Sequence, residues 1–214
     1  MQEAEIQARH KKQLSVMRGF LEGRQYFVAA EALEVVRQVS EGVRKDGITP
    51  QFHHQLSVAR FITTLTPHLI FPEETIAAAF LHDLLEDHGT KWTRRMLEEH
   101  FGKRIADAVW VLTKKSAGMT KTYELYFAEL ARCPVGSVVK VVDRAHNLQT
   151  MQGVFTLEKQ RLYVGEVEQH FYPLIRAARR AFPRQYGAYE NAKILIRCQC
   201  ALIEHIHAAS QEVS

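Results

Sequence analysis

Apolar side chains recur every three to four residues along most of the chain, the spacing that places them on one face of an α-helix. The segment 26–43 is a clear example, with apolar residues at helical intervals from Phe27 to Val39. Gly23 and Pro67 interrupt this pattern and are expected to end helices. The pattern predicts about nine or ten helices. The expected ranges are 3–21, 26–43, 52–65, 72–87, 93–100, 103–113, 120–131, 137–151, 157–182 and 184–207.

One stretch, from Val138 to Val142, has the β-branched composition of a strand. Apolar residues continue after it at helical spacing, at Ala145 and Leu148, so we predict a buried helix there. The sequence has no series of alternating apolar runs bounded by turns, which would indicate a sheet. It therefore predicts an all-α fold, a single helical bundle.

The size and composition of the chain are those of one soluble domain: 214 residues, 46% hydrophobic and 24% charged. We expect a single domain over residues 1–214, with its C-terminal helices at 157–207. No run of about 18 apolar residues occurs, so no membrane-spanning helix is expected. The first residues are polar and charged, unlike the apolar centre of a secretory signal peptide.

The cysteines indicate a reducing compartment. There are three of them, Cys133, Cys198 and Cys200, and an odd number without a signal peptide favours free thiols in the cytoplasm. The pair Cys198 and Cys200 would supply half of a zinc site, but the sequence offers no second half.

The net charge of the chain limits the classes of binding partner that we expect. Lys and Arg number 28 against 24 acidic residues, which gives a formal net charge of +4. This excess is too mild to indicate a nucleic-acid partner, although a local basic rim can still attract a small anion. These features do not predict the oligomeric state.

The predicted helix 72–87 ends in a cluster of ionisable residues. Because a helix turns about 100° per residue, His82, Asp83, Glu86 and Asp87 would share one sector of a continuous helix. Three carboxylates in a partly buried sector repel one another, and the negative end of the helix dipole adds to the repulsion. A divalent cation would remove this cost, and histidine and aspartate are suitable ligands. The alternative is a solvated acidic helix end with a surface histidine.

Two further places carry side chains that suit a metal. His53 and His54 lie at the start of the predicted helix 52–65, and Asp143 follows the apolar run 138–142. The alternatives are a capping or surface histidine, and an aspartate paired with an arginine. Together with the end of helix 72–87, these places supply two nitrogen and two oxygen ligands and leave positions for water and substrate, as in hydrolytic metal sites.

Four blocks stand out in this order along the sequence. They are Arg44-Lys45-Asp46-Gly47 followed by Thr49-Pro50; His54 followed by Val58-Ala59; Ala78-Ala79-Phe80-Leu81-His82-Asp83 with Glu86-Asp87; and Val139-Lys140-Val141-Val142-Asp143-Arg144-Ala145-His146-Asn147-Leu148. At these blocks, within residues 27–151, the chain resembles the HD-domain metal-dependent phosphohydrolases. More narrowly, it resembles the alarmone (guanosine 3′,5′-bispyrophosphate) hydrolases, both the hydrolase domain of the RelA/SpoT family and the stand-alone small enzymes.

This resemblance implies an HD-type helical domain that binds one divalent metal, usually manganese, and it selects His54 over His53 as a ligand. The implied metal ligands are His54, His82, Asp83 and Asp143. The implied pair that orients and activates the attacking water is Glu86 and Asp87. The implied contacts to the nucleotide are Arg44, Lys45, Asn147 and Thr150.

The implied activity is hydrolysis of the 3′-pyrophosphate of guanosine tetra- or pentaphosphate by a metal-activated water. Glu86, with Asp87, would accept the proton, while Arg44 and Lys45 would neutralise phosphate charge. Lys140 and Arg144 are expected to extend the basic rim.

Two alternatives stay open. One is an HD phosphohydrolase for another nucleotide, such as a deoxynucleotide or NADPH; the block Arg44 to Gly47 argues modestly against it. The other is a nucleotide-binding module without activity, since a fold does not fix a function. The presence of both Glu86 and Asp87 favours an enzyme, because a module that only binds has no evident use for a water-activating pair.

Overall fold

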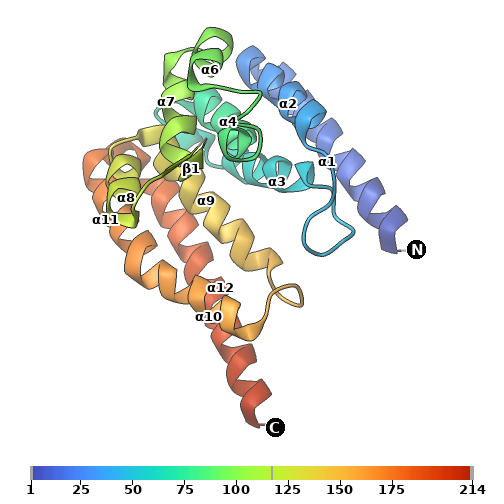
Figure 1. Ribbon diagram of the computed structural model, residues 1–214, viewed down its shortest axis with the longest axis vertical. Coiled ribbons are helices and arrows are strands. Elements are labelled where there is room, and N and C mark those ends of the chain that lie inside the picture. Colours follow the sequence, from blue (N-terminus) through green and yellow to red (C-terminus); the bar gives the residue numbers. More distant parts are fainter. Residues whose placement is uncertain (1, 117, 213–214) are drawn as a thin grey trace.

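The computed structural model describes residues 2–116 and 118–212, and most of them are helical (Figure 1). The predicted all-α fold is confirmed. The helices are α1 (Gln2–Arg24), α2 (Phe27–Val39), α3 (Phe52–Thr63), α4 (Pro72–Leu81), α5 (Leu84–Asp87), α6 (Arg94–Phe101), α7 (Lys103–Leu112), α8 (Tyr123–Ala131), α9 (Pro134–Thr150), α10 (Leu157–Glu166), α11 (Tyr172–Ala181) and α12 (Tyr186–Glu212). Shorter elements are 3-10 turns at Thr66–His68 and Pro183–Gln185, a π-helical turn at Val167–Phe171, and a hairpin of β1 (Lys115–Ser116) and β2 (Met119–Thr120). Within these described ranges, no helix is long and apolar enough to cross a bilayer.

Helix α4 occupies the interior because its sequence consists of small and apolar residues. Every residue from Thr75 to Leu81 is buried, including three consecutive alanines. Small side chains let neighbouring helices approach closely, and α4 packs against α2, α3, α7 and α9. The C-terminal end of α4 therefore delivers His82 into the interior of the protein.

Helix α9 connects the two halves of the molecule. It packs against α3 and α4 on one side and against α8, α11 and α12 on the other, and Figure 1 shows it between these groups. Its valines, Val138, Val139, Val141 and Val142, are all buried, and the helical prediction for this stretch is confirmed. Burial on all sides thus outweighs the weak strand preference of β-branched residues.

The prediction of an unbroken helix over 72–87 was wrong. Helix α4 ends at Leu81, His82 and Asp83 form a turn, and α5 is a separate short helix. The Nδ1 atom of His82 lies 2.8 Å from the carbonyl oxygen of Ala79, the group that a continuous helix would pair with the N–H of Asp83. The imidazole thus competes with the backbone ladder at this break.

The segment 40–51, predicted as helix up to Val43, forms a loop instead. The loop is closed by a bridge between Val43 and Pro50, and the Arg44 N–H donates to the Thr49 carbonyl (2.7 Å). Asp46 stabilises the turn within this loop, since its carboxylate accepts a hydrogen bond from the N–H of Thr49 (2.8 Å). The loop holds Arg44 at the entrance of α3.

Three other boundaries differ from the sequence pattern. Helix α1 continues through Gly23 and ends before Gln25, which adopts a positive φ of 57°. The paired strands β1 and β2 occupy Lys115–Ser116 and Met119–Thr120, and α8 begins at Tyr123. The predicted helix 157–182 contains a π-helical turn that ends just before Pro173, whose missing N–H cannot serve a regular helix.

Candidate metal and nucleotide site

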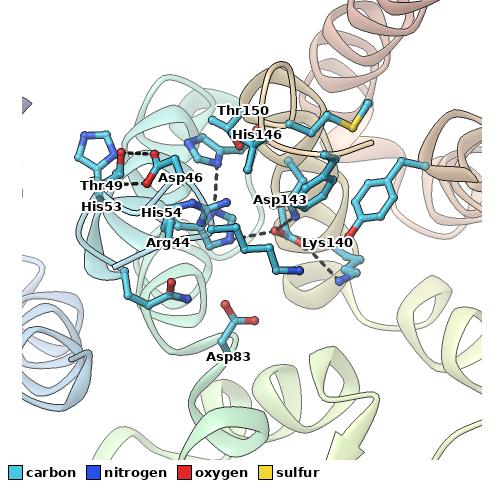
Figure 2. A pocket seen from close by; sticks show the side chains of 17 residues that line it. Arg44, Asp46, Thr49, His53, His54, Asp83, Lys140, Asp143, His146 and Thr150 are labelled. Atoms are coloured by element: carbon cyan, nitrogen blue, oxygen red, sulfur yellow. Dashed lines mark hydrogen bonds and ion pairs between the residues drawn. The ribbon is translucent and has the colours of Figure 1, made fainter. Parts of the chain in front are cut away.

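Four side chains from three segments converge where α3, α4 and α9 meet. His54 lies in the first turn of α3, His82 and Asp83 follow α4, and Asp143 lies within α9. One ligand atom from each of His54, His82 and Asp143 lies within 4.8 Å of the others, and all three residues are buried. Asp83 completes the group, because its Oδ2 lies 3.1 Å from Nε2 of His82. Figure 2 shows His54 and Asp143 in contact, with Asp83 close by.

The contacts behind His82 determine which of its nitrogens faces the group. In the neutral ring, Nδ1 carries the proton and donates it to the Ala79 carbonyl, which leaves a lone pair on Nε2. That Nε2 lies 3.2 Å from Nε2 of His54, which in turn lies 3.1 Å from Oδ1 of Asp143. Nitrogen and carboxylate lone pairs therefore point into one space, and this donor set fits a divalent transition metal.

The charges of the group also fit a cation. Burial by itself lowers the pKa of His82, but the carboxylates of Asp83 and Asp143 outweigh it and raise the pKa to about 9. Burial would raise the pKa of Asp143, yet Lys140 and the two imidazoles hold it well below its usual range. Without a metal, a proton on His82 thus supplies the positive charge that the carboxylates require.

Two neighbours on α9 hold the Asp143 carboxylate. The ammonium group of Lys140 lies 3.0 Å from Oδ2, and the Asn147 amide donates to Oδ1 over 2.7 Å. Both residues lie one helical turn from Asp143, on the same face of α9. Asn147, predicted to contact the nucleotide, thus also orients a metal-ligand candidate.

A cavity of about 380 Å³ lies against the cluster. The four residues predicted to contact the nucleotide, Arg44, Lys45, Asn147 and Thr150, all line it. Its other walls include Asp46, Thr49, His54, Asp83, Lys140, Asp143, His146, Phe155 and Tyr163 (Figure 2). The structure therefore brings most of the residues singled out in the sequence to one concave surface.

The rim of this cavity has a cation next to Lys45 that the sequence did not indicate. The ammonium groups of Lys45 and Lys159 lie 5.0 Å and 4.3 Å from the ring centroid of Phe155. The contact with Lys159, and then burial, lower the pKa of Lys45. Lys159 lies outside the four sequence blocks, so no pattern could identify it. Two adjacent cations at the rim of a cavity favour an anionic ligand.

Glu86 and Asp87 are not among the cavity-lining residues. Oε1 of Glu86 accepts hydrogen bonds from the backbone N–H groups of Lys114 (2.5 Å) and Lys115 (3.2 Å), at the start of the hairpin. Partial burial and the nearby Asp83 carboxylate raise the pKa of Asp87. The water-activating role of this pair stays a prediction.

The two adjacent histidines point in different directions. His53 packs edge-on against His10 of α1, with ring centroids 5.0 Å apart, whereas His54 joins the cluster. His146, for which no role was expected, places its Nδ1 2.9 Å from Nδ1 of His54. Burial lowers the pKa of His146 to about 3, so its ring is neutral.

Arg144, expected on the basic rim, faces another part of the molecule. Its guanidinium group stacks on Tyr163 and Phe171, with 4.5 Å and 4.4 Å to the ring centroids, and pairs with Glu166 (2.6 Å). Glu166 also accepts a hydrogen bond from the Tyr123 hydroxyl (2.8 Å). Arg144 therefore joins α9 to the C-terminal helices, while Lys140 alone of the two lines the cavity.

Comparison with known proteins agrees with this arrangement. Residues 32–122 match the family described as HD domain, a range that includes His54, His82 and Asp83 and ends before Asp143. A probable GTP pyrophosphokinase of Mycobacterium leprae is 31% identical over 153 residues, which is 69% of this chain and 19% of that protein. A guanosine-3′,5′-bis(diphosphate) 3′-pyrophosphohydrolase of Haemophilus influenzae is 28% identical over 148 residues, 65% of this chain and 21% of that protein. The bifunctional (p)ppGpp synthase/hydrolase SpoT of Escherichia coli is 26% identical over 152 residues, 67% of this chain and 21% of that protein.

Residues 32–122 of the chain are therefore similar to the HD domain family. Within this class, the chain is similar to the RelA/SpoT-type enzymes of guanosine polyphosphate metabolism, which confirms the resemblance seen in the sequence. It spans about a fifth of the length of these curated relatives (19% and 21%).

Proposed function

We propose that the site binds one divalent metal, manganese, and hydrolyses the 3′-pyrophosphate of guanosine tetra- or pentaphosphate. The observation that carries the proposal is the convergence of His54, His82, Asp83 and Asp143 beside a cavity with a cationic rim. The similarity to the 3′-pyrophosphohydrolase of H. influenzae and to the (p)ppGpp synthase/hydrolase of E. coli supports this substrate. Other relatives are named as pyrophosphokinases, so it is the metal-ligand cluster that favours hydrolysis.

The metal would be held by the two imidazoles and two carboxylates of the cluster. When bound, such an ion acidifies water and polarises a phosphoryl group. The ligand set of two nitrogens and two oxygens suits manganese as well as other first-row metals. Asp143 would be oriented by Lys140 and Asn147 while it serves the metal.

The substrate would be held by the cationic rim. Arg44, Lys45 and Lys159 would neutralise the phosphate charges, and Arg44 can do so with two parallel hydrogen bonds. Glu86 and Asp87 would accept the proton that the attacking water releases. Because the hairpin holds Oε1 of Glu86, the proton would go to Oε2.

A second candidate function is nucleotide binding without hydrolysis. It is favoured by one specific observation: Glu86 and Asp87 do not line the cavity, and the carboxylate of Glu86 contacts the hairpin. In this case the cluster and the cationic rim would serve recognition alone.

One experiment tests both candidates. The purified protein is incubated with Mn²⁺ and, separately, guanosine tetraphosphate, a deoxynucleoside triphosphate or NADPH, and the products are separated by ion-exchange chromatography. We expect pyrophosphate and guanosine 5′-diphosphate from the first substrate, abolished by a chelator and restored by Mn²⁺. Preferred hydrolysis of either other nucleotide would contradict the substrate. Tight binding of guanosine tetraphosphate without any product would establish the binding function instead.

A further inference from the structure

The imidazole of His146 lies behind His54, opposite the other ligand candidates. The two Nδ1 atoms are 2.9 Å apart, and the ring centroids are 4.8 Å apart. Two imidazole nitrogens at this distance share one hydrogen, so one ring donates and the other accepts. Which ring donates determines which nitrogen of His54 is available as a ligand.

When a metal is bound, the geometry of the cluster requires His54 to be the donor in this hydrogen bond. His54 faces His82 and Asp143 with Nε2, at 3.2 Å and 3.1 Å. To offer a lone pair on Nε2, the neutral ring must carry its proton on Nδ1 and donate it. His146 is the side chain in contact with that nitrogen, so His146 Nδ1 must accept.

We propose that His146 is a positioning residue of the metal site, which holds His54 in the tautomer and ring orientation that present Nε2 to the metal. The inference rests on the proposed function in that it requires a metal at this site. Acceptors behind metal-bound imidazoles are a general feature of metal sites, and their loss typically lowers metal affinity about 10- to 100-fold.

The hydrogen-bond acceptor for Nδ1 of His54 is a side chain, whereas the acceptor for Nδ1 of His82 is a backbone group. The rear nitrogen of His82 contacts a backbone carbonyl, that of Ala79, which no substitution removes. His146 and Asp143 lie one turn apart on α9, so this helix supplies one ligand and also supports another. A change at His146 should therefore weaken the metal site through His54 alone.

The surroundings of His146 make it suitable for substitution. It lines the 380 Å³ cavity and also a second cavity of about 420 Å³, bounded by α1, α3 and α9. The ring is only partly buried, so a smaller side chain leaves space for water rather than a void in the core.

The test compares Mn²⁺ affinity, measured by isothermal titration calorimetry, in the parent protein, His146→Ala and His146→Asn. We expect His146→Ala to bind Mn²⁺ about 10- to 100-fold more weakly. His146→Asn should regain most of the affinity, because its side-chain oxygen can accept the proton of His54 Nδ1. His100→Ala serves as the matched control, since His100 lies on α6 and its Nδ1 contacts the carbonyl of Met96.

A second measurement reports the tautomer directly. In protein loaded with Zn²⁺, which is diamagnetic, ¹⁵N NMR of the histidine rings should show the proton of His54 on Nδ1. In His146→Ala, the signals of His54 should shift or broaden, while those of His100 stay unchanged.

The outcomes separate this inference from the proposed function. Failure of the parent protein to bind Mn²⁺ overturns both together. Equal Mn²⁺ affinity in the parent and His146→Ala, with unchanged His54 signals, overturns the inference alone. Weak binding in His146→Ala that His146→Asn does not improve also overturns it, because the hydrogen bond would then not be the cause.

Discussion

At the scale of single residues, the buried carboxylate of Asp143 requires positive charge beside it. Its carboxylate is buried, with 5% of the residue exposed, and it contacts His54, Lys140 and Asn147. A buried carboxylate is tolerated only when it is paired and hydrogen-bonded. The same residue would therefore serve the metal and pairs with the partly buried ammonium group of Lys140.

This double role leads to a stability prediction for Asp143→Asn. Replacing the carboxylate leaves the Lys140 ammonium, whose side chain is 22% exposed, without its partner. Breaking a fully buried ion pair costs about 3–5 kcal/mol, and the partial exposure of Lys140 reduces this cost. We expect a loss of about 1–3 kcal/mol in the free energy of unfolding, measured by urea denaturation of chelator-treated protein.

Asp107→Asn provides a matched control, because Asp107 pairs with Arg94 and Lys103 at the surface. Exposed pairs contribute about 0–1 kcal/mol. In the double variant Asp143→Asn with Lys140→Met, part of the lost stability should return. Similar losses in Asp107→Asn and Asp143→Asn would contradict the buried pairing.

Among the elements, the hairpin β1–β2 is the one that contacts the proposed proton acceptor. The backbone N–H groups of Lys114 and Lys115, at the start of the hairpin, bind Oε1 of Glu86 and so fix its carboxylate in α5, just after the turn at His82 and Asp83. A glutamine at this position keeps an acceptor oxygen for the hairpin but removes the basic group.

The variant Glu86→Gln therefore distinguishes two roles of Glu86: its contact with the hairpin and its proposed role as proton acceptor. We expect it to retain Mn²⁺, since Glu86 is not a proposed ligand, and to lose about a hundredfold or more in kcat, the typical contribution of a general base. Metal content and kcat are measured on the same preparation. A kcat equal to that of the parent would show that Glu86 only anchors the hairpin, and loss of metal would show that it is a ligand.

The loop 40–51 is the element that positions the proposed phosphate contacts. Its hydrogen bonds are local, between Arg44 and Thr49 and between Asp46 and Thr49, so the loop keeps its shape independently of Arg44's side chain. A substitution of that side chain should therefore affect binding and not folding.

For Arg44→Ala we expect a higher KM for guanosine tetraphosphate with unchanged metal content. Losing charge-assisted hydrogen bonds costs about 1.5–3 kcal/mol, or roughly 10- to 150-fold. The KM should also depend less on salt, because fewer ionic contacts remain. Kinetics at two salt concentrations test this, with Arg95→Ala, an exposed arginine paired with Glu99, as control. Matching KM values in Arg44→Ala and the parent would contradict phosphate binding by Arg44.

In the whole molecule, the metal-ligand cluster joins segments that are distant in sequence. His54 and His82 belong to the N-terminal helices, whereas Asp143 lies on α9, which packs against the C-terminal helices. An unfolded chain cannot hold these side chains in place, so the metal would bind the native state alone.

Mn²⁺ should therefore stabilise the folded protein. At 100 times its dissociation constant, a ligand of the native state adds about 2.7 kcal/mol to the free energy of unfolding. Urea denaturation with and without Mn²⁺ at constant ionic strength measures the change. The same stabilisation in Asp143→Asn would place the metal elsewhere on the protein.

The sequence by itself determined the helical fold and most of the chemistry of the site. Apolar spacing reveals which faces are buried, because a helix repeats every 3.6 residues whatever surrounds it. It therefore indicated that α9 is a buried helix and that Asp143 would need a partner. The donor types of His82 and Asp83 are likewise a property of the residues alone.

The tertiary structure decided how these groups meet. Apolar spacing could not show that His54 rather than His53 faces the cluster, a choice that only the family resemblance suggested, or that His146 contacts His54. Both depend on the packing of α3 against α9. The break after Leu81 accompanies a contact of the His82 imidazole with the Ala79 carbonyl. Lys159, on a helix outside every motif, contacts Phe155 at the cavity wall. The spacing of apolar residues indicates which positions of a helix are buried. It does not indicate which side chains from distant segments lie next to them, and the site consists of such side chains.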